Sequence, residues 1–184
     1  MTLTKSSVCK FGEKAKDFKL LSTSNKNLSL NDVKGKNGTL VMFICNHCPY
    51  VKAVINDIIH ETKHLNTLGV NSIAIMSNDT SNYPEDSFNN MVLFSEKYDF
   101  SFPYVIDKTQ EVAKMYGAVC TPDFFGYNKN LELQYRGRFK ELKNLKPIKN
   151  GDSDLLIAMR KISKSGKGPR EQISSMGCNI KWCK

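Results

Sequence analysis

The chain has 184 residues, of which 40% are hydrophobic and 24% charged, and its 27 basic and 18 acidic side chains give a formal net charge of +9. This composition excludes a disordered chain and a collagen-like repeat, and it fits a single domain over 1–184, with a core of about 13–163 and a tail over 164–184. The longest apolar run, 40–45, is far shorter than the roughly 18 residues of a membrane-spanning helix.

The excess of positive over negative charge lies entirely in the last third of the chain. Residues 1–125 hold 13 basic and 13 acidic side chains, whereas 126–184 hold 14 basic and 5 acidic ones. Only four of those 14 are arginine, and no basic-aromatic recognition motif accompanies them. We therefore expect a solvated lysine-rich face, with no nucleic-acid or membrane partner. The first ten residues contain no apolar signal segment, which predicts a cytoplasmic location.

The first half of the chain alternates between strand and helix patterns. Residues 17–21 and 27–30 flank a polar turn and indicate a hairpin. The continuous apolar run over 39–44 predicts a strand that is buried on both faces. From Pro49 to Gly69 apolar residues recur at helical spacing. The predicted inner face of this helix consists of Val51, Val54, Ile55, Ile58, Thr62 and Leu65.

The second half continues the alternation. We expect strands over 70–76 and 104–106, a hairpin with arms 124–127 and 131–136, and three helices. The first helix starts at Pro84 and runs to about Tyr98, and Asp86 belongs to its first turn. The second has capping-box spacing at Asp107 and Gln110 and ends at Gly117, and the third is capped by Asp152 or Ser153. This order predicts an α/β fold, with a central mixed β-sheet covered by helices on both faces.

Two cysteines lie where the buried strand gives way to the long helix. Cys45 and Cys48 are separated by two residues, so they occupy one helical turn and are spaced to close a disulfide. The positive end of a helix stabilises thiolate, which is the form that attacks disulfides. We assign Cys45 as the nucleophile and Cys48 as the resolving thiol. His47, as imidazolium, is expected to lower the pKa of Cys45 further.

Three motifs in this order resemble the thioredoxin-like superfamily, in particular its branch of alkyl hydroperoxide reductase and thiol-specific antioxidant (AhpC/TSA) domains. They are Lys16-Asp17-Phe18, the segment from Met42 to Pro49, and Tyr116-Gly117-Ala118-Val119-Cys120-Thr121-Pro122. The resemblance covers roughly residues 13–140. It implies a thioredoxin-like fold, a cis bond between Thr121 and Pro122 facing the cysteine pair, and a Thr121 backbone that pairs with substrate.

The active-site pattern departs from the family in its acids. Thioredoxins carry a buried acid six residues before the first cysteine, where this chain has Thr39, and related reductases carry one three residues after the second, where it has Val51. The proton acceptor for Cys48 is therefore expected to be His47, solvent or an acid from elsewhere in the chain.

A peroxide reductase is the nearest alternative function. Peroxiredoxins use a cysteine-proline step such as Cys48-Pro49, together with a hydroxyl three residues earlier and an arginine from a distant strand. Arg136 or Arg138 can supply that arginine, but Cys45 stands in place of the hydroxyl.

Metal binding is a third candidate function. The pairs Cys45/Cys48 and Cys178/Cys183 together offer four thiolates for zinc, and His47 offers a copper ligand. A zinc-protease motif, His60-Glu61-Thr62-Lys63-His64, lies on the long helix, but both histidines are expected on its solvent side. We therefore expect no bound metal and no organic cofactor.

The remaining cysteines are candidates for auxiliary thiols. Cys120 precedes Pro122 by two residues, and Cys178 and Cys183 lie in the tail. A mobile tail can relay a disulfide from Cys45–Cys48, but we favour a packed tail anchored by Trp182, because large apolar side chains are costly to leave in water.

The sequence as a whole predicts a thiol-disulfide oxidoreductase. Its expected substrates are protein disulfides, dithiols or small thiols, and hydroperoxide is the alternative substrate.

Overall fold

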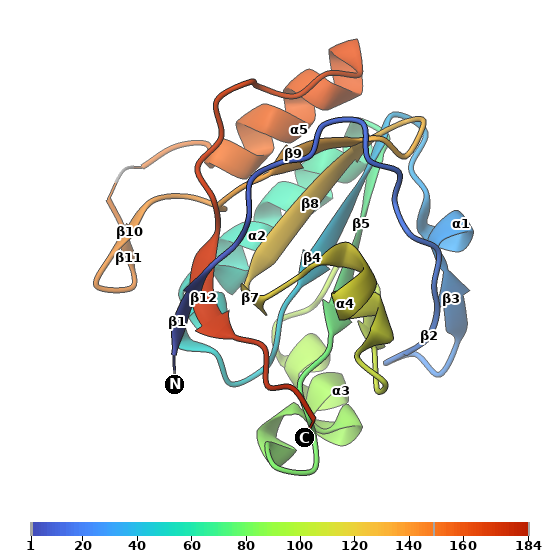
Figure 1. Ribbon diagram of the computed structural model, residues 1–184, viewed down its shortest axis with the longest axis vertical. Coiled ribbons are helices and arrows are strands. Elements are labelled where there is room, and N and C mark those ends of the chain that lie inside the picture. The colour runs from blue at the N-terminus through green and yellow to red at the C-terminus, as the bar shows by residue number, and fades with distance from the viewer. Residues whose placement is uncertain (1, 149, 184) are drawn as a thin grey trace.

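A seven-stranded mixed sheet forms the centre of the molecule (Figure 1). The computed structural model describes residues 2–148 and 150–183. Within the sheet β4, β5 and β6 run parallel, and the other neighbours are antiparallel. In spatial order its strands are β3 (Asn27–Ser29), β2 (Lys19–Ser22), β6 (Tyr104–Ile106), β5 (Val70–Met76), β4 (Gly38–Phe43), β8 (Asp123–Asn128) and β9 (Leu133–Arg136).

Helices cover both faces of this sheet because β4 is apolar at every position that points into the two cores. Leu40 and Met42 pack with residues of α2, α3 and α5, whereas Val41 and Phe43 pack with residues of α1 and α4. The helices are α1 (Leu30–Val33), α2 (Pro49–Thr67), α3 (Phe88–Lys97), α4 (Glu111–Tyr116) and α5 (Asp154–Ser165). The predicted mixed α/β architecture is thereby confirmed.

Most predicted elements are present, with two local corrections. All six residues predicted for the inner face of α2 are buried, and Ser153 caps α5 as expected. Pro84–Asp86, however, forms a separate 3-10 turn, and α3 begins only at Phe88. Gln110 makes no capping box, because its backbone is left-handed (φ 63°). Asp107 instead accepts a hydrogen bond from the Ala113 amide at 2.9 Å.

The C-terminal segment packs against the body of the protein. β12 (Met176–Asn179) lies between β1 (Leu3–Lys5) and β7 (Cys120–Thr121) in a second sheet of three antiparallel strands. The expected packing of the tail is confirmed for this strand, but the expected anchor is wrong. Trp182 is 39% exposed, whereas Ile180 is 1% exposed and fills the core beside α4. A small hairpin, β10 (Leu142–Lys143) and β11 (Lys146–Pro147), completes the fold.

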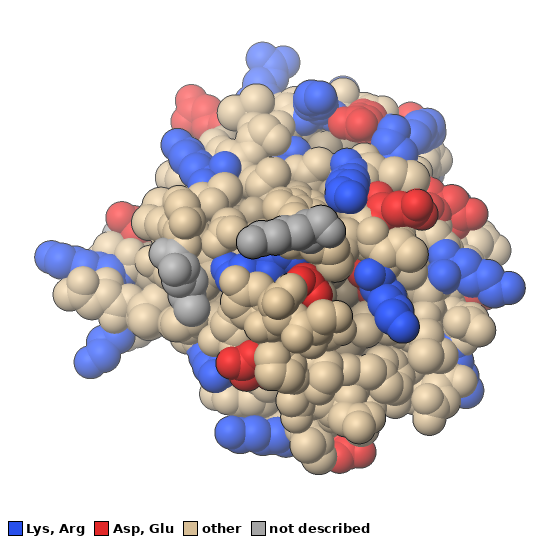
Figure 2. Space-filling model, turned by 60° about the horizontal axis from the view of Figure 1, so that its bottom comes forward, with Lys and Arg blue, Asp and Glu red and all other residues tan. Residues whose placement is uncertain are grey.

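The surface shows how the positive charge is distributed. On the face drawn in Figure 2, the described lysines and arginines are scattered and interspersed with acidic side chains, and they form no continuous patch. None of the helices over 2–148 and 150–183 is long and apolar enough to cross a membrane.

Candidate active site

The cysteine pair lies at the carboxyl end of β4, where the chain turns into α2. Cys48 is the N-cap of that helix and Pro49 its first residue, so the chain turns within three residues of Cys45. Both thiols are buried, with 1% and 0% of Cys45 and Cys48 exposed. Thr121 faces them: its hydroxyl lies 3.3 Å from the Cys45 sulfur, and its carbonyl accepts a hydrogen bond from the Cys48 thiol at 3.1 Å. The Thr121–Pro122 bond is cis, as expected.

The two thiols have opposite acidities. The hydrogen bond from Cys45 lowers the pKa of Cys48 to about 5, against the opposing effect of burial, and Cys178 contributes in the same direction. The same hydrogen bond to Cys48, together with burial and the nearby Asp86 carboxylate, raises the pKa of Cys45 well above its usual value. The expectation that Cys45 has the lowered pKa is therefore wrong. The helix N-terminus favours thiolate at Cys48, and the Cys45 thiol donates a hydrogen bond to that thiolate.

A buried carboxylate that the sequence motifs did not reveal lies beside the pair. The Asp86 side chain is 0% exposed and accepts a hydrogen bond from His47 Nδ1 at 2.7 Å. This hydrogen bond raises the pKa of His47, and burial opposes the rise. Burial also opposes ionisation of Asp86, but hydrogen bonds from His47 and Asn78 outweigh it and lower the pKa of Asp86. Asp86 is thus a buried acid that comes from elsewhere in the chain and acts on Cys45, whose pKa it raises. The identity of the proton acceptor for Cys48 stays a prediction.

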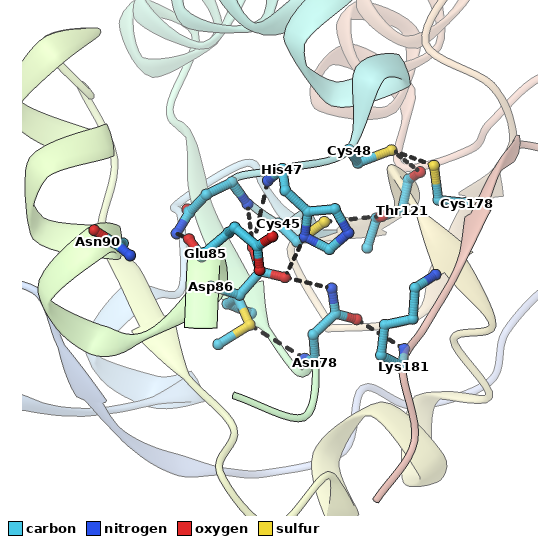
Figure 3. A network of polar contacts seen from close by, with 12 residues as sticks. Cys45, His47, Cys48, Asn78, Glu85, Asp86, Asn90, Thr121, Cys178 and Lys181 are labelled. Carbon is cyan, nitrogen blue, oxygen red and sulfur yellow. Dashed lines mark hydrogen bonds and ion pairs between the residues drawn. The ribbon is translucent and has the colours of Figure 1, made fainter. Parts of the chain in front are cut away.

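Two asparagines hold this carboxylate in place, Asn46 through its backbone amide and Asn78 through its side chain (Figure 3). Asp86 also accepts hydrogen bonds from the Asn46 amide at 2.8 Å and from Asn78 Nδ2 at 2.7 Å. Asn46 in turn is fixed by the Tyr104 hydroxyl at 2.9 Å, and Asn78 Oδ1 accepts from the Lys181 amide at 2.9 Å. The C-terminal segment is therefore connected to the cysteine loop through one hydrogen-bonded network. The carboxyl ends of the adjacent parallel strands β4 and β5 meet at this edge, which is the sequence signal for such a cluster.

The pair of His47 and Asp86 predicts a pH-dependent contribution to stability. Because the pKa of His47 is raised in the folded protein, its interaction with Asp86 contributes fully to stability at pH values below the unfolded-state histidine pKa of about 6.5. This contribution is lost as the pH rises through the pKa of His47 in the folded protein. Because the pKa of Asp86 is lowered in the folded protein, its hydrogen bonds contribute fully to stability at pH values above the unfolded-state aspartate pKa of about 3.9. This contribution is lost as the pH falls through the pKa of Asp86 in the folded protein. We expect His47→Gln to lower the free energy of unfolding by about 1–3 kcal/mol between those limits, and by less at higher pH. Urea unfolding from pH 4 to 9 measures this.

His60→Gln is the matched control for that titration, because His60 is exposed on α2. Its difference from the wild-type protein should stay within about 0.5 kcal/mol at every pH, as surface substitutions do. A pH-independent effect of His47→Gln would show that the hydrogen bond to Asp86 does not depend on the imidazolium charge.

The auxiliary cysteines separate into one thiol at the site and two beside or away from it. The Cys178 sulfur lies 3.0 Å from that of Cys48. Cys120 is buried, and its thiol donates to the Pro122 carbonyl at 3.7 Å. Cys183 is exposed, and its backbone amide donates to Gln110. Among the described residues, 2–148 and 150–183, no group that could hold a metal ion contains Cys48, Cys178 or Cys183.

Both arginines that could serve a peroxide reductase make structural contacts. Arg136 donates to Asp123 and to the Gly117 carbonyl, and Arg138 donates to Asp154 and Glu141, so carboxylates hold both guanidinium groups.

Two residues of the HExxH motif also make structural contacts. Glu61 is buried and accepts a hydrogen bond from the Ser153 amide, and His64 accepts one from Arg160, whereas His60 is exposed.

One metal-capable cluster is found among residues 2–148 and 150–183. It consists of Cys45, His47 and Asp86, whose ligand atoms lie within 4.8 Å of one another. Within this cluster, His47 Nδ1 and an Asp86 oxygen form a hydrogen bond with each other, so both atoms already have a partner.

The chain is similar to known proteins in sequence and in structure. Residues 11–139 match the model of the AhpC/TSA family. The chain is 28% identical over 130 residues to thiol-disulfide oxidoreductase ResA of Bacillus thuringiensis subsp. konkukian, covering 69% of each chain. The crystal structure of an uncharacterized conserved protein from Geobacillus kaustophilus superposes with a TM-score of 0.94 at 37% identity, covering 100% of this chain and 97% of that one.

A more distant neighbour identifies the fold. The thioredoxin domain of a thiol-disulfide oxidoreductase from Bacteroides vulgatus superposes with a TM-score of 0.59 at 17% identity, covering 73% of this chain and 89% of that one. The fold is thus thioredoxin-like, and the cysteine loop and the cis-proline loop face each other within it.

Proposed function

Since this chain belongs to the AhpC/TSA family, we propose that it is a thiol-disulfide oxidoreductase that works through Cys45 and Cys48. The observation that carries this proposal is the pair of buried thiols with opposite pKa shifts at the start of α2. A proton shared between the two thiols lets the Cys48 thiolate act as the base that deprotonates Cys45, and the Cys45 thiolate formed in this way is the species that thiol-disulfide exchange requires.

The reaction proceeds in two exchanges. The Cys48 thiolate takes the proton of Cys45, and the Cys45 thiolate attacks one sulfur of the substrate disulfide. The substrate sulfur that leaves takes up that proton, and a mixed disulfide remains on Cys45. Cys48, again a thiolate, attacks the Cys45 sulfur, which forms the Cys45–Cys48 disulfide and releases the second substrate sulfur as a thiolate that takes a proton from water according to pH. Two electrons have passed from the protein to the substrate.

Neighbouring groups assist each step. The Thr121 hydroxyl, 3.3 Å from the Cys45 sulfur, stabilises its thiolate. The Asp86 carboxylate has the opposite effect, and its hydrogen bond with His47 raises the pKa of His47, so that the imidazolium form offsets part of that negative charge when it is present. Protein disulfides or small thiols are the proposed substrates, and the proposed location is the cytoplasm.

Turnover of two substrates by the same preparation tests the function. We expect the reduced protein to reduce insulin disulfides with dithiothreitol as electron donor, and a redox titration to show a reversible Cys45–Cys48 disulfide. Cys48→Ser should stop multiple turnover and accumulate a mixed disulfide at Cys45. Cys183→Ser, which changes an exposed thiol away from the site, is the control.

Two results would contradict the proposal. Faster turnover of hydrogen peroxide than of any disulfide would favour a peroxide reductase. Tight zinc binding by the reduced protein without redox turnover would favour a metal-binding protein.

A further inference from the structure

A third thiol completes a row of sulfur atoms at the site. Cys178 lies on β12, is 2% exposed, and its sulfur is 3.0 Å from that of Cys48 (Figure 3). Cys48 also interacts with Cys45, and this interaction shifts the pKa values of both thiols. Cys48 therefore has two candidate disulfide partners, Cys45 and Cys178. A disulfide bond is about 2.05 Å long, so the sulfurs of Cys48 and Cys178 need to approach by only about 1 Å.

The backbone holds Cys178 in this position. Cys178 is the register partner of Thr121 in the antiparallel pairing of β12 with β7, and of Leu3 in the pairing with β1. Gly177 allows the close approach, because a Cβ atom there would lie 2.1 Å from the Thr121 carbonyl oxygen. β12 thus occupies the edge beside Thr121 and Pro122 that the family resemblance assigns to a substrate backbone.

Anchors on both sides of β12 fix its position along β7. Before the strand, the Ser175 hydroxyl donates to the Gly137 carbonyl at 2.8 Å, and the Ser6 amide donates to the Ser175 carbonyl at 2.9 Å. After the strand, the Lys181 amide donates to Asn78 and its carbonyl accepts from the Asp79 amide. The thiol of Cys178 is therefore held against Cys48 by a strand that is fixed at both ends.

Building on the proposed function, we propose that Cys178 is a third exchanging thiol, which forms a second disulfide with Cys48. In the oxidised protein the Cys178 sulfur, as thiolate, attacks the Cys48 sulfur of the Cys45–Cys48 disulfide. The Cys48–Cys178 bond forms, the Cys45–Cys48 bond breaks, and Cys45 leaves as thiolate and takes up the proton that Cys178 lost. The step consumes no oxidant or reductant, because one disulfide and one thiol are exchanged for another disulfide and thiol.

The exchange gives the oxidised protein two isomeric forms. In one, Cys45 and Cys48 are joined and β12 is held only by hydrogen bonds and packing. In the other, a covalent bond ties β12 to the start of α2, while Cys45 is a thiol again. In this second form the disulfide joins Cys48 to Cys178, while Cys45, the residue that reacts with the substrate, is reduced.

Tryptic peptides distinguish the two isomers. Cleavage after Lys36 and Lys52 leaves Cys45 and Cys48 on one peptide, and cleavage after Arg170 and Lys181 leaves Cys178 on another. The full-length protein is equilibrated in a glutathione redox buffer, quenched with acid, alkylated and digested. We expect the wild-type protein to give both the disulfide within peptide 37–52 and a cross-link between 37–52 and 171–181.

Variants assign the cross-link to its sulfurs. Cys45→Ser should convert the oxidised protein to the cross-linked form, and Cys48→Ser should lose the cross-link. Cys178→Ser should also lose it but retain the disulfide within 37–52. Cys183→Ser, four residues from Asn179 and on the same segment, should match the wild-type protein in both linkages.

The outcomes separate this inference from the proposed function. If the wild-type protein forms the Cys45–Cys48 disulfide and reduces insulin, but neither it nor Cys45→Ser gives the cross-link, the inference is wrong and the function stands. If the wild-type protein forms no Cys45–Cys48 disulfide and reduces no insulin, the proposed function is wrong. Circular dichroism of each variant checks that a missing cross-link does not reflect unfolding.

Discussion

Asp86→Ala is expected to lower the free energy of unfolding by about 3–5 kcal/mol, the range seen when one partner of a buried charged pair is removed. The substitution leaves His47 Nδ1, the Asn46 amide and Asn78 Nδ2 without their shared acceptor, and all three hydrogen bonds are 2.7–2.8 Å long. Unsatisfied buried donors retain their full desolvation cost. Urea unfolding of the reduced protein at neutral pH measures the change.

The same variant should alter thiol reactivity. The Asp86 carboxylate raises the pKa of Cys45, so its removal should lower that pKa and shift the alkylation profile to lower pH. Asp99→Ala is the matched control, because the Asp99 side chain is 90% exposed and its ion pair with Lys63 is solvated. Such surface pairs contribute at most about 1 kcal/mol. Equal losses of unfolding free energy in the two variants would show that the buried network around Asp86 contributes no more to stability than a solvated surface ion pair.

Gly177→Ala is expected to detach β12 from the cysteine pair. The added Cβ would lie 2.1 Å from the Thr121 oxygen and 2.7 Å from its carbonyl carbon, and these are backbone atoms beside a cis-proline. Overpacking of this kind costs about 1–3 kcal/mol or more. If that cost falls on the pairing of β12 with β7, alkylation of Cys45 and Cys48 accelerates about tenfold for each 1.4 kcal/mol.

Alkylation kinetics and thermal unfolding together test this prediction. Met176→Ala is the control, since Met176 lies next in the same strand and is 52% exposed. Unchanged alkylation of Gly177→Ala, with unchanged melting temperature, would mean that β12 shifts without leaving the site.

Sequence patterns predict the elements that depend on local spacing. Apolar spacing predicts the strand over 70–76 and the inner face of α2, because burial repeats at fixed intervals along those segments. Cys45, Cys48 and the Thr121–Pro122 bond are also identifiable, because each belongs to a short contiguous motif.

The rest of the site depends on contacts between distant residues. The hydrogen bond between His47 and Asp86 joins residues that are 39 positions apart in the sequence, and the contact between Cys48 and Cys178 joins residues that are 130 positions apart. No local pattern contains them. The predicted acidity of Cys45 is wrong for the same reason. The helix terminus is visible in the sequence, whereas the burial of both thiols and the neighbouring carboxylate arise only in the folded chain.

The complete burial of the thiol pair limits the kinetics of the enzyme. Cys45 lies two residues after the end of β4, which is hydrogen-bonded along both edges, so movement of that strand would require unfolding of the sheet. β12 meets β7 through two residue pairs and is the less costly segment to open. At low reagent concentration, the observed rate is then the opening equilibrium constant multiplied by the rate of the exposed thiol. At high concentration it levels off at the opening rate, so reagents of very different intrinsic reactivity share one maximum.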